Sequence, residues 1–340
     1  MRYLVSLLLL FVLAITAQAK PVKVFILAGQ SNMQGKAKVS LLEYQATQPN
    51  APEMFKRLKK DGKWIERPDV WCKYFNEIGN LTVGYHKSQS IGPELGFGLV
   101  VGDHYEEQVL IIKTAWGGRS LYRDFRSPSA GLPKADVLEK MLDGAQKGKP
   151  KTTMDEIKKS FGATYREMCD EVNGTLADIK KHFPGYAGQG YELAGFIWFQ
   201  GWNDMINAEA TSEYTVNLGH FIRDVRADFK SPKLPFVVGE MGVDGVNGSA
   251  GVKKFKAAQA AVMATPEFKG NVVVVKTDVF WDTEADAIFK KSWKQNLAEW
   301  NKVGSDFPFH YLGSPKTMLR IGHAFGEAVL DLRGEKKARQ

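Results

Sequence analysis

Short apolar runs and longer amphipathic stretches alternate along the chain. The apolar runs are rich in β-branched and aromatic residues and occupy residues 22–28, 108–114, 194–199, 235–239 and 271–277. Runs without polar alternation are typical of parallel strands, because helices cover both faces of such a sheet. Helix-like stretches occupy residues 93–104, 160–182, 210–229, 252–264 and 315–332. The alternation predicts an α/β protein, a three-layer α/β/α sandwich with a parallel five-stranded sheet and right-handed crossovers.

Two connections between these elements are much longer than the others, residues 36–90 and residues 121–191. Loops of more than about 15 residues in a compact domain are usually functional or locally folded. We interpret both as insertions over a single domain of residues 20–340, and not as a second domain. Each holds one of the two cysteines, Cys72 and Cys169. These could pair in an exported protein or remain two free thiols.

The first 19 residues differ from the rest of the chain. Arg2 precedes an apolar run at residues 3–15, and Ala17-Gln18-Ala19 is a small-x-small site. This pattern predicts a signal peptide over residues 1–19, cleaved between Ala19 and Lys20. A membrane anchor is the alternative, but the run is shorter than the ~20 residues that span a bilayer. We therefore expect a secreted or periplasmic protein without stable membrane association after cleavage.

Composition narrows the class of protein. The 340 residues are 44% hydrophobic and 25% charged, which is ordinary for a globular protein and excludes a disordered or multispan membrane chain. The net charge of +8 resides largely in lysine-rich stretches, and no nucleic-acid motif accompanies them. The six histidines are scattered, with no HExxH or CxxC spacing. We expect no nucleic-acid partner, no metal and no cofactor.

The sequence Gly29-Gln30-Ser31-Asn32-Met33 directly follows the first apolar run. Ligands of α/β sheets bind at the carboxyl ends of the strands. A serine on a tight turn there would expose its hydroxyl and leave its own N–H free, as a catalytic nucleophile requires. An ordinary helix N-cap serine is the alternative interpretation.

Two further strand ends carry groups that can stabilise an oxyanion. Gly117 and Gly118 follow the second apolar run, and paired glycines let a backbone N–H approach a ligand. Gln200 follows the third run within Trp198-Phe199-Gln200-Gly201-Trp202-Asn203-Asp204, and its amide could donate to the same oxyanion. A plain turn and a buried structural glutamine are the alternatives. Residues near this edge are candidate substrate contacts: Gln30, Trp116, Arg119, Trp202 and Asn203.

A histidine from a late loop would supply the general base. His310 lies just before the last predicted helix, where the chain returns to the same edge of the sheet. His323 falls within that helix, so we favour His310.

Together, GQSNM, the WGG turn, the WFQG segment and the late histidine resemble the SGNH hydrolases. Within them, the chain resembles the sialate O-acetylesterase domain family, also called carbohydrate esterase family 6, over roughly residues 22–330. The resemblance implies a flavodoxin-like sheet and a metal-free serine esterase that removes O-acetyl groups from sugars. It implies Ser31 as nucleophile and His310 as base. The implied oxyanion hole comprises the N–H groups of Ser31 and of Gly117 or Gly118, with the Gln200 side chain.

Two departures from the family pattern concern the acid that orients His310. Trp202 stands where the family usually has Glu, and Phe307 stands where many relatives have Asp. Asp306 is our first choice for this acid, and Asp204 is the second.

The sequence thus predicts a secreted carbohydrate O-acetylesterase with a Ser–His mechanism. Its expected substrates are acetylated poly- or oligosaccharides of the acetyl-xylan or sialate kind. The alternative is a carbohydrate-binding protein on the same fold with impaired catalysis. A lipase or thioesterase is disfavoured by the GQSNM motif.

Overall fold

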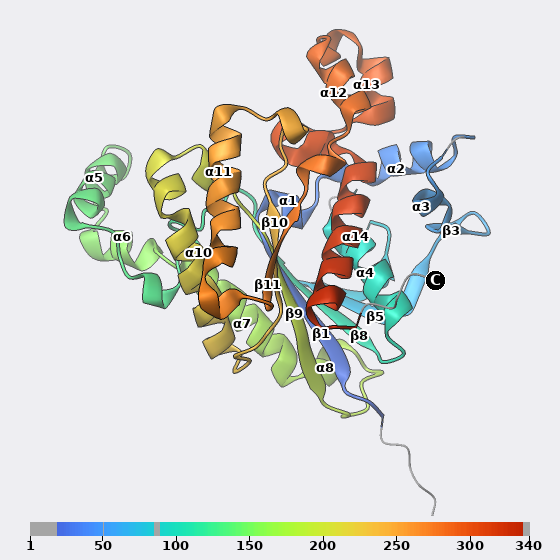
Figure 1. The fold of residues 1–340 in the computed structure, drawn as a ribbon, viewed down its shortest axis with the longest axis horizontal. Helices are drawn as coiled ribbons and strands as arrows, with labels where there is room; N and C mark the ends of the chain where they lie inside the picture. The colour runs from blue at the N-terminus through green and yellow to red at the C-terminus, as the bar shows by residue number, and fades with distance from the viewer. Residues whose placement is uncertain (1–18, 50, 85–88, 336–340) are drawn as a thin grey trace, which may run out of the picture.

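The central element is a seven-stranded sheet with the strand order β11-β10-β9-β1-β8-β5-β6 (Figure 1). The computed structural model describes residues 19–49, 51–84 and 89–335, so the predicted signal peptide, apart from Ala19, lies outside it. The strands are β1 Val22–Gly29, β5 Glu66–Tyr74, β6 Glu77–Thr82, β8 Val109–Ala115, β9 Tyr191–Phe199, β10 Phe236–Glu240 and β11 Val272–Lys276. All neighbours pair in parallel except β6, which pairs antiparallel with β5.

The five predicted strands are confirmed as β1, β8, β9, β10 and β11. Numbered in chain order, they lie in the flavodoxin-like arrangement 2-1-3-4-5. The sheet has two more strands than predicted, and both come from the segment interpreted as an insertion. β5 escaped prediction because it opens with Glu66, Arg67, Pro68 and Asp69. It also holds the buried Lys73, which forms an ion pair with Glu171 of a distant helix.

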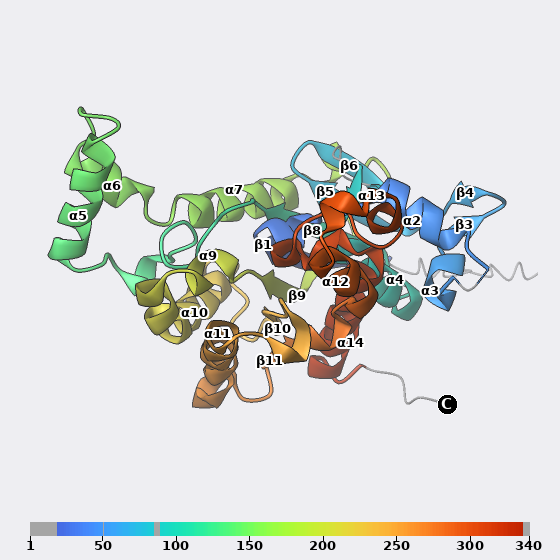
Figure 2. The same cartoon turned by 90° about the horizontal axis from the view of Figure 1, so that it is seen from above.

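Helices cover both faces of the sheet, which confirms the three layers (Figures 1 and 2). Successive residues of β1 point to opposite cores: Phe25 and Leu27 into one, Val24 and Ile26 into the other. The first core is closed by α4 Pro93–His104 and α14 Pro315–Leu332, whose bounds match the prediction. The second is closed by α7 Ala163–Ala177, α8 Ile179–His182, α10 Ala208–Asp228 and α11 Ala250–Ala260.

Three excursions surround this core. The first carries β2 Ala37–Lys38, α2 Val39–Ala46, α3 Glu53–Lys56, the hairpin β3 Lys59–Lys60 with β4 Lys63–Trp64, and β7 Ser90–Ile91. The second carries α5 Ala135–Gln146 and α6 Met154–Ser160, which project from the body in Figures 1 and 2. The third, not singled out from the sequence, places α12 Thr283–Lys290 and α13 Leu297–Val303 between β11 and α14. It has its own small apolar cluster around Trp300.

The two cysteines do not form a disulfide with each other. Cys72 is buried in β5, and Cys169 lies partly buried in α7. Burial and the nearby Asp228 carboxylate raise the pKa of the Cys169 thiol to about 12. Within the described part of the chain, no helix has the length and apolar character needed to cross a membrane.

Candidate active site

The carboxyl ends of β1, β8 and β9 meet at Gly29. The N–H of Trp116 donates to the Gly29 carbonyl oxygen at 3.1 Å, and the N–H of Gln30 donates to the Phe199 carbonyl oxygen at 3.3 Å. A Cβ on Gly29 would lie 2.1 Å from the Phe199 oxygen, so no side chain fits there. The turn that follows β1 is therefore held between two strand ends, at the switch point of the flavodoxin-like order.

Ser31 begins α1 Ser31–Gln34, a single helical turn directly after this junction. Its N–H belongs to the first turn of the helix, where amides have no partner within the helix. Gly117 lies beside it, because a Cβ on Gly117 would be 4.0 Å from the Ser31 Cβ. Gly118 has φ +71°, a left-handed conformation that suits glycine. The structure therefore brings the predicted serine and the predicted glycine turn together.

His310 lies in the short irregular helix η7 Pro308–Gly313, which precedes α14. Its Nδ1 is 3.0 Å from Oδ1 of Asp306, and that oxygen also accepts a hydrogen bond from the Phe307 N–H at 2.7 Å. Partial burial opposes ionisation of Asp306, but the hydrogen bonds from His310 and Phe307 outweigh it and lower the pKa of the carboxyl. Of the two acids considered from the sequence, Asp306 is the one that contacts His310.

The His310 loop is anchored on two sides. The Asn32 side-chain amide donates to the Phe309 carbonyl oxygen at 3.1 Å, which ties the loop to the turn that carries Ser31. Behind His310, Tyr311 and Leu312 both have left-handed backbones, with φ +52° and +60°. Such conformations are strained for non-glycine residues and persist only where the surroundings hold them.

The Tyr311 side chain keeps this left-handed backbone in place. Its ring is fully buried, and its hydroxyl accepts a hydrogen bond of 2.7 Å from the Gly242 N–H. The same hydroxyl shares a 2.6 Å hydrogen bond with Thr277. Because Gly242 and Thr277 follow β10 and β11, the sheet itself fixes the backbone next to His310. Sequence reasoning missed both Asn32 and Tyr311, although Asn32 stood inside the quoted GQSNM motif.

Gln200 lies at the same strand ends, but its side-chain amide is already taken up by hydrogen bonds within the protein. Its Nε2 lies 3.1 Å from the Gln30 side-chain oxygen, 2.9 Å from the Arg119 carbonyl oxygen and 2.6 Å from the Asp204 carboxylate. An amide has two hydrogens for these three acceptors. The Gln200 side-chain oxygen accepts from the Tyr214 hydroxyl at 3.1 Å. In this structure Gln200 braces the strand ends and has no free hydrogen for an oxyanion.

Asp204 is the centre of this brace and has no contact with His310. Its carboxylate is fully buried and accepts hydrogen bonds of 2.8 Å from the backbone N–H groups of Leu121 and Tyr122. Burial raises the pKa of Asp204 to about 6, against the opposing effect of its hydrogen bonds. Asp204 therefore fixes the loop after β8 and does not take the second-choice role of orienting His310.

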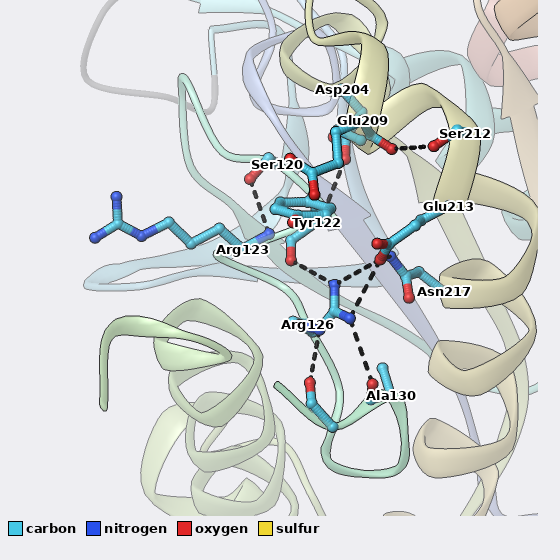
Figure 3. A network of polar contacts seen from close by, with 12 residues as sticks. Ser120, Tyr122, Arg123, Arg126, Ala130, Asp204, Glu209, Ser212, Glu213 and Asn217 are labelled. Carbon is cyan, nitrogen blue, oxygen red and sulfur yellow. Dashed lines mark hydrogen bonds and ion pairs between the residues drawn. The ribbon is translucent and has the colours of Figure 1, made fainter. Parts of the chain in front are cut away.

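This loop continues into a second, partly buried polar network (Figure 3). The Arg126 guanidinium donates to the Tyr122 carbonyl oxygen at 3.1 Å and pairs with Glu213 of α10 at 3.2 Å. Figure 3 shows Arg123 pointing away from this network, toward the outside of the loop. Asp204 and Arg126 thus both fix the segment that follows the glycine turn.

Comparison with known proteins agrees with this geometry. A family model described as carbohydrate esterase, sialic acid-specific acetylesterase, matches residues 21–289. The chain belongs to this family. The resemblance inferred from GQSNM and the two later strand ends is therefore confirmed, while Asp306 and His310 lie beyond the matched residues. No curated protein matches the chain.

Two solved structures share the fold. A protein from Arabidopsis thaliana is 15% identical, with a TM-score of 0.51 over 92% of this chain and 98% of its own. A carbohydrate acetylesterase from Xanthomonas citri is 13% identical, with a TM-score of 0.50 over 92% of this chain and 57% of its own. At these identities the likeness concerns the fold alone.

The residues that the sequence predicted as substrate contacts of this carbohydrate esterase differ in their surroundings. Gln30 is buried, and its side-chain oxygen accepts from the Gly201 N–H at 3.2 Å, so it braces the strand ends and has little surface for a substrate. Trp116 packs against Phe75 and Phe125. Arg119 is the more accessible residue, 3.5 Å from Asp124.

Trp202 and Asn203 begin the short helix α9 Trp202–Met205 after β9. The Trp202 ring centre is 5.4 Å from that of Phe309, next to His310. The partly buried Asn203 side chain has no hydrogen-bond partner among the residues that the structure describes. His323 is exposed on α14. Over residues 19–49, 51–84 and 89–335, no three His, Cys, Asp or Glu side chains gather in an arrangement suited to a metal ion.

Proposed function

We propose that the protein is a serine O-acetylesterase that acts on acetylated carbohydrates. The observation that carries this proposal is the position of Ser31 beside Gly117, next to a loop that bears the His310–Asp306 pair and is tied to the Ser31 turn through Asn32. Membership in a carbohydrate esterase family supports the class of reaction.

In the proposed mechanism, Asp306 accepts the Nδ1 proton of His310 in a hydrogen bond, which leaves Nε2 free to take the Ser31 proton. The Ser31 oxygen attacks the acetyl carbonyl carbon, and the oxyanion accepts hydrogen bonds from the N–H groups of Ser31 and of Gly117 or Gly118. Protonated His310 gives its proton to the leaving sugar hydroxyl. Water, deprotonated by His310, then releases acetate and restores Ser31.

A side-chain amide at the end of β9 would complete the oxyanion hole. Gln200, expected from the sequence, uses its amide hydrogens on Gln30, Arg119 and Asp204. Asn203 lies three residues further along the same turn and offers an amide without a partner among the described residues. We therefore assign this role to Asn203.

For the substrate, we propose an acetylated poly- or oligosaccharide that the protein meets outside the cytoplasm. Export rests on the sequence pattern of residues 1–19. The rival, a carbohydrate-binding protein without catalysis, is motivated by Trp202 at the position where the family usually has Glu.

Acetate release decides between the two. Wild-type protein should release acetate from at least one member of a panel of acetylated sugars, acetyl-xylan included, and from short but not long acyl esters. Ser31→Ala should abolish release. The matched control is Ser129→Ala, because Ser129 also contacts a histidine, His220, at 2.8 Å but lies on the surface away from the strand ends. No release by folded wild type would favour the binding protein.

A further inference from the structure

A groove of about 880 Å³ opens beside the candidate active site, between α2 and the α12–α13 excursion. Aromatic side chains from separate segments line it: Tyr44, Phe289, Trp293, Trp300 and Phe307. Tyr44 is 39% exposed and Phe307 is 48% exposed, so both residues are partly accessible to solvent. We call this feature the aromatic groove. Its volume is within the usual range for small-ligand sites of about 300–1,000 Å³.

The aromatic groove is continuous with the candidate catalytic residues. Asp306, the partner of His310, is one of its lining residues. Phe307 stacks on Phe309, with ring centres 5.5 Å apart and planes 7° apart. The Phe309 ring lies 4.5 Å from the His310 ring. A row of neighbouring aromatic rings thus connects the aromatic groove to His310.

Further rings extend this row at both ends. Trp293 lies 6.1 Å from Phe307 on the groove side, and Trp202 lies 5.4 Å from Phe309 on the active-site side. The row thus runs from the α12–α13 excursion, through the segment before His310, to the turn after β9.

The lining combines apolar faces with polar edges. Ser40 and Asn301 add a hydroxyl and an amide, and Lys38 and Lys302 add two ammonium groups. A purely apolar ligand would desolvate these groups without hydrogen bonds, which is unfavourable. A sugar ring has an apolar face and a rim of hydroxyls, so it can stack on the rings and hydrogen-bond to the rim of the groove at the same time. The ammonium groups also suit an acidic sugar.

We propose that the aromatic groove binds the sugar residues adjoining the acetylated one, so that the protein acts on a saccharide chain in preference to a single acetylated sugar. This inference rests on the proposed function for the placement of the acetyl group at Ser31. Trp293, Trp300 and Phe307 lie beyond the residues matched by the family model, whereas Tyr44 and Phe289 lie within them.

Binding is tested first, in a variant that cannot turn substrate over. Ser31→Ala protein is titrated with xylo-, manno-, gluco- and galacturono-hexasaccharides while tryptophan fluorescence is followed. At least one hexasaccharide should bind, and the matching monosaccharide should bind at least about tenfold more weakly. Adding Trp293→Ala should weaken hexasaccharide binding about tenfold, and Trp293→Phe should recover part of it. Tyr44→Ala, on the exposed side of the groove, provides a second variant that does not touch the Trp300 cluster.

Kinetics then separate this inference from the proposed function. The ratio of kcat/KM on an acetylated hexasaccharide to kcat/KM on the acetylated monosaccharide should fall about tenfold in Trp293→Ala, through KM. Tyr191→Ala is the control, because Tyr191 is 43% exposed at the opposite end of β9. If the enzyme is active but this kcat/KM ratio is the same in wild type and Trp293→Ala, the groove does not bind the saccharide chain. The proposed esterase activity would still stand. Hexasaccharide binding that depends on Trp293, without any acetate release, would overturn the proposed esterase and leave the sugar-binding groove standing.

Discussion

The Asn32 side-chain amide donates a hydrogen bond of 3.1 Å to the carbonyl oxygen of Phe309, across 277 positions of sequence. Asn32 is the neighbour of Ser31, and Phe309 is the neighbour of His310. The bond therefore helps to set the distance between the proposed nucleophile and its base, although neither residue takes part in it.

Removing this bond should slow turnover more than it weakens substrate binding. A misplacement of about 1 Å can cost about 100-fold in rate. We expect Asn32→Ala to lower kcat between about 10-fold and 100-fold with KM nearly unchanged, in steady-state assays on an acetyl ester. Asn173→Ala, on the exposed face of α7, is the control. An unchanged kcat would show that the loop holds His310 in place without Asn32.

Asp306 should be essential to the rate. Its carboxylate contacts Nδ1 of His310 at 3.0 Å and fixes the tautomer that leaves Nε2 free. We expect Asp306→Asn to lower kcat by about 10²–10⁴-fold while the circular dichroism spectrum stays that of the wild type. Activity within threefold of wild type would mean that another group orients His310.

Gln200 and Asn203 should respond differently to substitution. Removing the Gln200 amide leaves the buried Asp204 carboxylate and two other acceptors short of a donor, so Gln200→Ala should cost about 1–3 kcal/mol in the free energy of unfolding. Asn203→Ala should leave stability nearly unchanged and lower kcat by about 10²–10³-fold, the usual effect of losing one oxyanion donor. Urea unfolding and kinetics on both variants separate the roles. A normal kcat in Asn203→Ala would remove Asn203 from the oxyanion hole.

Asp204 should make stability depend on pH. Its pKa is about 6 in the native protein and about 3.9 in an unfolded chain. The native state thus holds the proton more tightly, so this stabilisation is complete below about pH 4 and is lost as pH rises through about 6. Two pKa units correspond to about 3 kcal/mol. Urea unfolding should show the stability of wild type relative to Asp204→Asn falling by up to that amount between about pH 4 and pH 7. A pH-independent difference would contradict the raised pKa.

A buried ion pair supports the end of the Ser31 turn. The Lys113 ammonium lies 2.7 Å from the Glu94 carboxylate and donates to the Gln34 carbonyl oxygen at 2.8 Å, with both side chains almost fully buried. Lys113→Met would leave Glu94 charged and unpaired, which should cost about 3–5 kcal/mol in the free energy of unfolding.

The double variant Lys113→Met, Glu94→Leu should recover much of this loss, because no unpaired charge remains. Lys140→Met is the matched control. Lys140 pairs with Asp136 on the exposed face of α5, and surface pairs contribute less than about 1 kcal/mol. Equal losses in the two lysine variants, measured by urea unfolding, would contradict this account.

The sequence by itself determined the features that depend on neighbouring residues. Continuous apolar runs were enough to predict the five strands. The amphipathic stretches predicted α4 and α14, and each helix starts at a proline, Pro93 or Pro315, in its first turn. The placement of Ser31 at the rim followed from the first strand ending at Gly29. Each of these rests on chain-local preferences, which the sequence carries in full.

Tertiary structure decided whatever depends on partners distant in sequence. Asp306 and Asp204 were both candidates to orient His310, and only the folded chain shows that Asp306 contacts it while Asp204 binds the loop after β8. Gln200 stood at the predicted strand end, but its partner Gln30 lies 170 positions away. Which acceptors share the two hydrogens of the Gln200 amide is fixed only when the strand ends meet.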